Sequence, residues 1–405
     1  MLLSSFFKIS LKFFRGSSVA SLASFFAMII LVKNLELTEY GLLILVQAIV
    51  MFIEGVSTSQ SWQTVVRYYK IDSRIASQTL YVDGVNVVFS LLLLLVACYI
   101  SEWLGAPAEL LILYGLILPF KFLGTWSGIA RELDEVGCIS RQMQIVGFGK
   151  FFTAILTYIY VLSINEIIML FVFFEIIGAL YFVRSVLTKV KLENLIQPFN
   201  FDRGLVRFTV ITHLNATTVL SVRYFDELLV AKTLGVETLA VYKVIKTIVA
   251  IISKLVEPMY LVIYPMINRM IIKVQKHELK ILLAQISIIF SLVGVFFILG
   301  VVLLGDIGLL YLTGKEVGYN ALIVHTVGVT LNLIFFYAHP LAIATGNEGR
   351  VFILNIILGG FYLLSLMFVG GTFGLLGVSI LALIYTVLSA LFRLFFSISF
   401  FRSGF

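Results

Sequence analysis

The segment at residues 281–304, ILLAQISIIFSLVGVFFILGVVLL, contains no charged side chain. An α-helix of about 20 consecutive apolar residues crosses the hydrocarbon core of a bilayer, so this segment is long enough to span a membrane. Apolar runs of similar length recur from one end of the chain to the other. Because backbone polar groups in lipid must bond to each other, such runs favour helices. The pattern predicts a polytopic, all-α integral membrane protein.

The composition supports this class and excludes others. Of the 405 residues, 60% are hydrophobic and 13% are charged, with a mean hydropathy of +1.08. A soluble domain is about half apolar and about one quarter charged. Soluble enzymes, nucleic-acid binders and secreted domains are therefore excluded. Cys98 and Cys138 suggest no disulfide framework, and the four histidines do not cluster. We expect no cofactor and no metal ion.

The apolar runs predict about twelve transmembrane helices joined by short connections. A basic stretch with Lys8, Lys12 and Arg15 precedes the first run. That run is long for a signal peptide and the next follows closely, so we interpret it as a membrane span. The predicted spans are 17–33, 41–66, 80–100, 108–130, 143–163, 166–187, 205–234, 236–266, 280–304, 318–344, 350–369 and 375–400.

Charge asymmetry predicts the orientation. Nearly all Lys and Arg residues of the connections lie on one side, whereas the other side holds Lys33 and Lys315 among acidic residues. Because Lys and Arg of short loops are retained in the cytoplasm, both termini are expected to be cytoplasmic.

The longest basic connection, residues 188–204, divides the chain into equal halves. We expect an N-terminal six-helix lobe at 1–190, a cytoplasmic linker at 191–204 and a C-terminal six-helix lobe at 205–405. Equal halves of one topology indicate parallel repeats about an axis along the membrane normal, a common plan of transporters.

The segment YKVIKTIVAIISKLVEP, residues 242–258, is unusual because it places charges within an apolar span. Helical periodicity puts Lys243, Lys246, Lys254 and Glu257 on one face. Each charge near the bilayer centre costs about 2.5–3.5 kcal/mol on insertion scales. This face is therefore expected to line a hydrated cavity or to be paired. The structural alternatives are snorkelling of Lys243 and Lys246 and pairing of Lys254 with Glu257.

Other spans add polar side chains to the predicted cavity. The seventh span places Arg223, Asp226 and Glu227 on one side, at a spacing that also suits structural ion pairs. The second span has Glu54 on a polar stripe that leads to Arg67 at its cytoplasmic end. The third span and spans nine to twelve are nearly all apolar.

Four further polar residues lie singly within the predicted spans. Lys121 and Lys150 are expected to snorkel, and Glu175 has no visible partner. His213 is expected to be a hydrogen-bonded interior histidine.

The cations of these faces outnumber the acids, and clustered cations in a low-dielectric cavity attract phosphate. Arginine binds phosphate as a fork and lysine as a point charge. We therefore infer a phosphate-bearing amphiphile as the substrate. The substrate-binding candidates are Arg15, Arg67, Arg223, Lys243, Lys246 and Lys254, and the candidates for charge balance or ion coupling are Glu54, Asp226 and Glu257.

Four stretches resemble one family of transporters. Residues 13–68 combine a serine-rich first helix, an acidic turn with Tyr-Gly, and a second helix that ends in Arg. Residues 213–269 contain an acid before Leu-Leu, then Gly, Tyr and a closing Pro. Residues 342–350 (AIATGNEGR) and 373–380 (FGLLGVSI) are also similar. The chain resembles the Wzx-type O-antigen and capsule repeat-unit flippases of the multidrug/oligosaccharidyl-lipid/polysaccharide flippase (MOP) superfamily.

The resemblance implies a V-shaped flippase fold, with two six-helix lobes around a central cavity. It implies a non-enzymatic flippase of the bacterial inner membrane that moves undecaprenyl-pyrophosphate-linked oligosaccharide by alternating access. Such a protein serves O-antigen, lipopolysaccharide or capsule assembly, together with the polymerase and the chain-length regulator of the pathway. An ion gradient drives some members.

Two other classes stay open. A multidrug/cation antiporter of the same superfamily would bind cations, which a lysine-rich cavity repels. A polysaccharide polymerase or a membrane O-acyltransferase is also polytopic. A polymerase usually has a large external loop with arginines, which this chain lacks, and His213 and Asn215 lie on different helical faces, which disfavours an acyltransferase.

Overall fold

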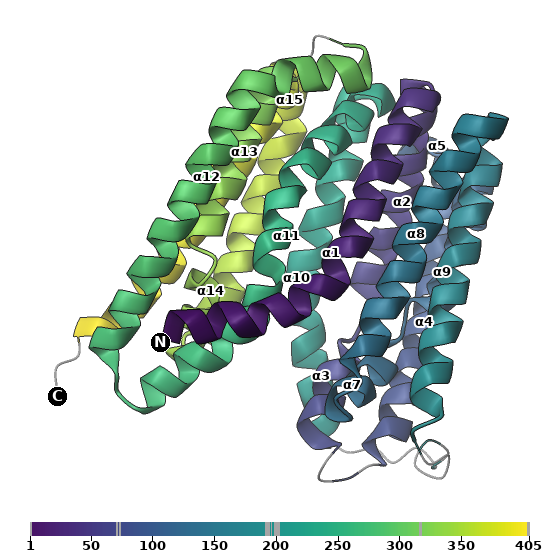
Figure 1. Cartoon of the computed structure of the whole chain (residues 1–405). Coiled ribbons are helices and arrows are strands. Elements are labelled where there is room, and N and C mark those ends of the chain that lie inside the picture. The colour runs from purple at the N-terminus through teal and green to yellow at the C-terminus, as the bar shows by residue number, and fades with distance from the viewer. Residues whose placement is uncertain are drawn as a thin grey trace. The chain divides into compact units, whose positions relative to one another are not determined.

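The chain is described as a computed structural model that covers residues 2–69, 72, 74–190, 195, 197, 203–315 and 318–402 (Figure 1). These residues form helices and short connections, without a strand among them. The elements are α1 (Leu2–Asn34), α2 (Leu37–Ser57), α3 (Ser61–Tyr68), α4 (Ile75–Tyr99), α5 (Ser101–Leu104), α6 (Ala108–Gly115), the 3-10 helix η1 (Leu118–Phe120), α7 (Gly124–Glu132), α8 (Val136–Tyr160), α9 (Ile164–Leu187), α10 (Arg203–Leu234), α11 (Val236–Ile272), α12 (Lys276–Thr313), α13 (Tyr319–Ile334), α14 (Ala338–Ala344) and α15 (Glu348–Arg402).

The prediction of an all-α membrane protein is confirmed. Seven helical stretches of the described residues are long and apolar enough to cross a membrane, by length and composition. Each of the twelve predicted spans coincides with helix. The predicted spans outside the seven stretches lie in the more polar helices α8, α10 and α11 or in the shorter apolar part of α1, and the two last spans share α15.

Three predicted spans are interrupted rather than continuous, and one of them, span 318–344, is split into α13 and α14 at residues 335–337. Span 41–66 is split into α2 and α3 at residues 58–60, where Gln60 has a left-handed φ of 53°. Span 108–130 is split into α6, η1 and α7, with Pro119 at the start of η1. Proline lacks an N–H group and clashes with the preceding turn, so it ends the α-helical ladder there.

The two halves of α15 meet at Gly374, which has φ 59° and ψ −151°. This region of backbone conformation is open essentially to glycine only. The break falls between the predicted spans 350–369 and 375–400, so these spans are two helical segments joined by a single-residue turn.

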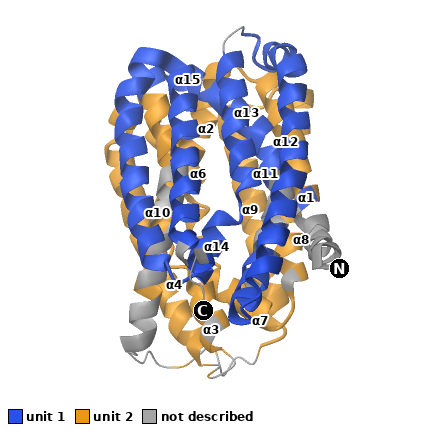
Figure 2. Cartoon of the chain, turned by 90° about the vertical axis from the view of Figure 1, so that its left-hand side faces the viewer, with its two compact units in different colours: residues 1–18, 233–405 blue, residues 19–232 orange. Residues whose placement is uncertain are grey.

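The chain folds as two compact units (Figure 2). Unit 1 contains residues 1–18 and 233–405, and unit 2 contains residues 19–232. The six-helix lobes bounded at residues 191–204 stay a prediction, because lobes are defined by repeat topology and units by packing.

In unit 2, α4 is polar inside and apolar outside. Its buried side chains include Ser77, Asp83, Asn86 and Ser90, whereas Leu95 on the opposite face is 65% exposed. The prediction that the third span is nearly all apolar is therefore wrong for its buried face. Such an arrangement suits a membrane helix, because lipid contacts the apolar face and protein partners satisfy the polar one.

In unit 1, the apolar face of α11 packs against α12 and α14. A core cluster includes Ile252 and Ile267 of α11, Phe290 of α12 and Leu341 of α14. Ile245, on the same side of α11, is also fully buried. The packing fixes the rotation of α11 about its axis and therefore the direction of its lysine face.

A close contact between α8 and α1 in unit 2 provides a test of this packing. A Cβ atom at Gly147 would lie 2.6 Å from the carbonyl oxygen of Ala20, whereas a Cβ at Gly137 of the same helix would meet open space. Gly147→Ala is expected to destabilise the protein by about 1–3 kcal/mol through overpacking. Gly137→Ala is expected to be neutral or stabilising, since alanine favours helix. Melting temperatures of the purified variants in detergent check this, and equal melting of the two variants would contradict the described α1–α8 contact.

Candidate functional site

The break between α2 and α3 is surrounded by polar side chains of unit 2. Nδ1 of His213 lies 2.6 Å from the carbonyl oxygen of Thr58, and Nδ2 of Asn86 donates to Oγ of Ser59 at 2.7 Å. Nε1 of Trp62 donates to the side-chain oxygen of Gln60 at 2.6 Å. At this break, side-chain hydrogen bonds replace the backbone hydrogen bonds of a continuous helix. The prediction that His213 is hydrogen-bonded is confirmed.

Asp83 of α4 connects this break to α7. Its carboxylate accepts hydrogen bonds from Oγ of Ser61 at 2.6 Å and from the backbone N and Oγ1 of Thr125 at 2.9 and 2.7 Å. The two donors stand at the first turns of α3 and α7, where helix N-termini favour a negative group. Asp83 is 6% exposed, so these three bonds replace its hydration.

Lys121, Lys150 and Glu175 form an ion cluster in unit 2, in which Glu175 is buried and the two lysines are partly buried. Nζ of Lys121 lies 2.8 Å from one oxygen of Glu175, and Nζ of Lys150 lies 3.6 Å from the other. Glu54 of α2 interacts electrostatically with both Lys121 and Glu175. The expectations that the lysines are isolated and that Glu175 lacks a partner are therefore wrong, because these side chains come from helices distant in sequence. Glu54 is placed beside this cluster.

The predicted acids of the seventh span lie in the interior of unit 2. Asp226 is 6% exposed and Glu227 is 2% exposed. Glu227 interacts electrostatically with Tyr40 of α2. Burial of both acids excludes a lipid-facing position for this side of α10.

Lys243 and Lys246 of α11 are partly buried within unit 1. Nζ of Lys246 lies 5.3 Å from the centroid of the Tyr242 ring, which is fully buried. The ring of His325 on α13 meets the same Tyr242 ring edge-to-face, at 6.1 Å and 82°. The ammonium of Lys246 acts electrostatically on His325. His325 was not predicted as a site residue, because the four histidines of the chain lie far apart in the sequence.

A second polar group in unit 1 surrounds Arg393 of α15. Its guanidinium donates to Oδ1 of Asn355 at 2.9 Å and acts electrostatically on His339 and Tyr385. Arg393 is not among the site residues predicted from the sequence. The structure places it beside polar side chains of α14 and of both halves of α15.

The predicted site is described only in part. The side chains of five candidates lie outside the described residues, and their roles stay predictions: Arg15, Arg67, Arg223, Lys254 and Glu257. Lys243 and Lys246 lie together on α11 of unit 1, whereas Glu54, Asp226 and Glu227 lie in unit 2. The joint site of cations and acids from both units also stays a prediction.

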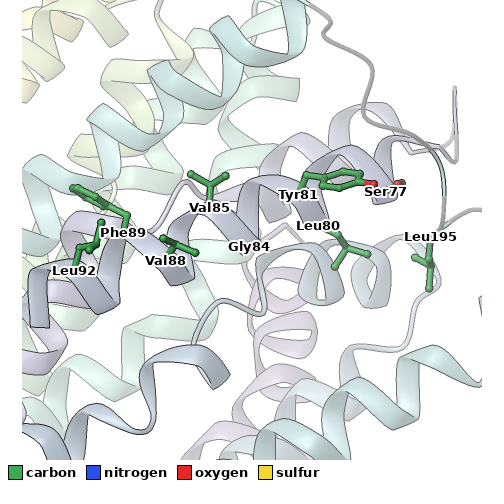
Figure 3. A pocket seen from close by; sticks show the side chains of 9 residues that line it. All are labelled: Ser77, Leu80, Tyr81, Gly84, Val85, Val88, Phe89, Leu92 and Leu195. Atoms are coloured by element: carbon green, nitrogen blue, oxygen red, sulfur yellow. The ribbon is translucent and has the colours of Figure 1, made fainter. Parts of the chain in front are cut away.

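Unit 2 also has two apolar grooves, whose linings do not include the predicted site residues. One, of about 720 Å³, follows the outer face of α4, with Ser77 and Leu195 at one end and Leu92 at the other (Figure 3). The other, of about 670 Å³, lies along α8 and α9. Its lining includes Arg141 and Tyr181, and Nη1 of Arg141 donates a hydrogen bond to the Tyr181 hydroxyl at 3.2 Å. Within the described ranges, His, Cys, Asp and Glu residues form no metal-binding cluster.

The ion cluster of unit 2 generates a prediction on stability. Glu175→Leu leaves Lys121 and Lys150 without their carboxylate, and removal of one partner from a buried pair costs about 3–5 kcal/mol. The matched control is the triple variant Lys121→Met, Lys150→Met and Glu175→Leu, which removes the three charges of the cluster and keeps Glu54 beside it, and part of the loss is expected to be restored. Thermal unfolding of the three proteins in detergent measures the effect, and a single variant as stable as wild type would show that the cluster does not stabilise unit 2.

Comparison with known proteins identifies the fold. No family model matches the chain, and no curated protein matches its sequence. Solved structures of similar fold include a multidrug resistance MATE family transporter of the MOP superfamily in an inward-facing conformation (TM-score 0.71, 15% identity, 94% of each chain covered). An outward-facing structure of such a transporter is also similar (TM-score 0.65, 16% identity, 98% of this chain and 95% of that chain). A third is a MOP superfamily transporter from Pyrococcus furiosus, described by a reverse polarity of its binding pocket that suggests a different function (TM-score 0.67, 15% identity, 98% and 96% covered). The chain therefore has the fold of MATE and other MOP superfamily transporters.

Proposed function

We propose that this protein is a multi-pass membrane transporter, and not an enzyme, that works by alternating access. The proposal is supported by the fold, since similar structures of transporters have been obtained in inward-facing and outward-facing conformations. It is also supported by polar and charged side chains within membrane-length helices, which mark transport pathways more often than structural cores.

The proposed cargo is an undecaprenyl-pyrophosphate-linked oligosaccharide, flipped across the bacterial inner membrane for O-antigen or capsule assembly. The observation that supports it is the position of Lys243 and Lys246, partly buried in the interior of α11. Among the described side chains of unit 1, acids lie toward the ends of their helices, at Glu237, Glu278, Asp306 and Glu348. Neighbouring lysines in a low-dielectric interior attract a phosphate group, which supports a phosphate-bearing cargo.

The other cations complete the proposed pathway. Arg223 and Lys254 hold the pyrophosphate with Lys243 and Lys246, while Arg15 and Arg67 attract the headgroup on the cytoplasmic side, where both termini lie. Glu54, Asp226 and Glu257 balance charge or bind a coupling ion. The flippase hands its product to a polymerase and a chain-length regulator.

The second candidate is a multidrug/cation antiporter, which is favoured by the likeness to structures of multidrug resistance MATE transporters. Cation binding needs carboxylates that are free to meet the cargo. In unit 2, Asp83 accepts three hydrogen bonds and Glu175 is paired with two lysines, so both are already engaged. The MOP superfamily transporter for which a reverse polarity of the binding pocket suggests a different function supports the idea that proteins of this fold differ in pocket polarity.

Reconstituted protein tests the cargo. A fluorescent polyprenyl-diphosphate-linked sugar in proteoliposomes becomes accessible to an impermeant quencher when it is flipped. The double variant Lys243→Gln/Lys246→Gln is expected to slow flipping roughly tenfold or more, because each lost charge-assisted contact is worth about 1.5–3 kcal/mol. Lys280→Gln, which removes one exposed cation from the start of α12, is the control and is expected to flip like wild type.

The same vesicles separate the two candidates. Wild-type protein that leaves the lipid-linked sugar unflipped but accumulates a lipophilic cation such as tetraphenylphosphonium would contradict the flippase and favour the antiporter. Flipping that is equal in wild type and the double variant would contradict the binding role of the two lysines.

A further inference from the structure

The groove between α8 and α9 of unit 2 has a charged end and apolar walls. The two helices lie side by side (Figure 1). A Cβ atom at Gly149 would clash with the Phe174 ring, so this glycine of α8 admits the aromatic ring of α9 between the helices. Both residues line the groove, which has a volume of about 670 Å³. The close approach of the two helices therefore shapes the floor of the groove.

The groove lies on the face of α8 opposite to the ion cluster. Helical periodicity places Lys150 of the cluster about 180° around the helix axis from Arg141, which lines the groove. Phe148 and Phe152, on the same side of α8 as Arg141, are each 50% exposed. An exposed apolar face of a membrane helix contacts acyl chains, because the hydrocarbon core holds no water. We therefore expect lipid to fill the groove.

Arg141 and Tyr181 form the polar end of the groove. Arg141 is exposed and precedes the predicted span 143–163, and its Nη1 donates a hydrogen bond to the Tyr181 hydroxyl at 3.2 Å. A guanidinium has five N–H groups in a planar fork, so this bond orients Arg141 while further donors can bind an anion. Tyrosine is typical of the depth at which lipid headgroups begin.

The charges around this end favour an anionic headgroup. Within residues 133–141 and 181–189, Arg141, Arg184 and Lys189 outnumber Asp134 and Glu135. Glu135, which acts electrostatically on Arg141, forms an ion pair with Lys189. The charge asymmetry of the chain predicts that this end is cytoplasmic. Basic sites between membrane helices on that side bind the headgroups of anionic lipids.

The length of the groove fits one leaflet of a bilayer. From Arg141 to Phe152, α8 rises about 16 Å at about 1.5 Å per residue. Half of the hydrocarbon core of a bilayer is about 15 Å thick. An acyl chain whose headgroup is held at Arg141 therefore runs along Phe148 and Phe152 as far as the bilayer midplane.

We propose that the groove between α8 and α9 binds an anionic glycerophospholipid of the predicted cytoplasmic leaflet. The phosphate group binds the guanidinium of Arg141 beside Tyr181, and one acyl chain packs against Phe148, Phe152 and Ile177. A zwitterionic lipid fits the apolar walls equally well but leaves the positive charge of this end unbalanced. The proposed cargo-binding residues do not line the groove, so this inference does not depend on the cargo.

Native mass spectrometry of the purified full-length protein tests the site. Palmitoyl-oleoyl phosphatidylglycerol and phosphatidylethanolamine are added in equal amounts to the protein in detergent, and the bound fractions are compared. Wild type is expected to bind phosphatidylglycerol more tightly. Arg141→Gln is expected to weaken this binding roughly fivefold or more, the effect of one basic residue at an anionic headgroup. Binding of phosphatidylethanolamine is expected to be unchanged, which also reports an intact fold.

Three further variants separate the groove from the general charge of the surface. Arg184→Gln removes an exposed cation of the same end that does not line the groove, and it is expected to keep most of the preference for phosphatidylglycerol. Arg141→Lys retains the charge and is expected to keep part of the preference. Phe152→Ala removes apolar surface far from the headgroup and is expected to weaken the binding of both lipids by a similar factor, because their acyl chains are identical.

The other outcomes overturn the site or its occupant. Equal binding of the two lipids to wild type, or a preference that Arg184→Gln reduces as much as Arg141→Gln does, shows that Arg141 does not read a headgroup in the groove. An equal loss of both lipids in Arg141→Gln has the same meaning. Arg141-dependent displacement of phosphatidylglycerol by an equal amount of undecaprenyl phosphate would assign the groove to a polyprenyl chain. A lipid-free dimer that Phe152→Ala dissociates would assign it to a second copy of this chain.

Discussion

The free-energy cost of a charge in hydrocarbon governs where the side chains of this protein lie. A lone charge at the bilayer centre costs several kcal/mol, so each one in a membrane-length helix needs a partner, water or a ligand. Asp83 meets this need with three hydrogen bonds, and Glu175 meets it with two lysines. The same free-energy cost explains why the polar face of α4 is buried and its apolar face is exposed.

Apolar run lengths were enough to predict the helices but not their interruptions. The runs at 280–304 and 166–187 correspond to α12 and α9, because membrane crossing imposes a minimum length that hydropathy reveals. The break at residues 58–60 was not visible, because no proline or glycine occupies it, and the hydrogen bonds to Thr58 and Ser59 come from helices distant in sequence. Pro119 was a visible signal, but one proline within an apolar run does not reveal whether the helix bends or ends.

The candidate site shows a similar limit. The lysines of α11 were identified because helical periodicity acts within a single element, and a charged face stands out against an apolar background. In the cluster of Lys121, Lys150 and Glu175, Lys121 and Glu175 are 54 positions apart in sequence, and a single sequence contains no signal for such pairing. His325 was overlooked for the same reason, since its significance comes from Tyr242 on another helix.

The interrupted second span has a mechanical consequence. α2 and α3 are two separate helices joined by residues 58–60. Side chains of α4 and α10 hydrogen-bond to this connection, in place of a continuous ladder of backbone hydrogen bonds. These side-chain hydrogen bonds break and re-form one at a time, without unwinding a turn of helix. The tilt of either α2 or α3 can therefore change while the other helix stays intact. Unit 2 can thus rearrange near one membrane face while its remaining packing is preserved.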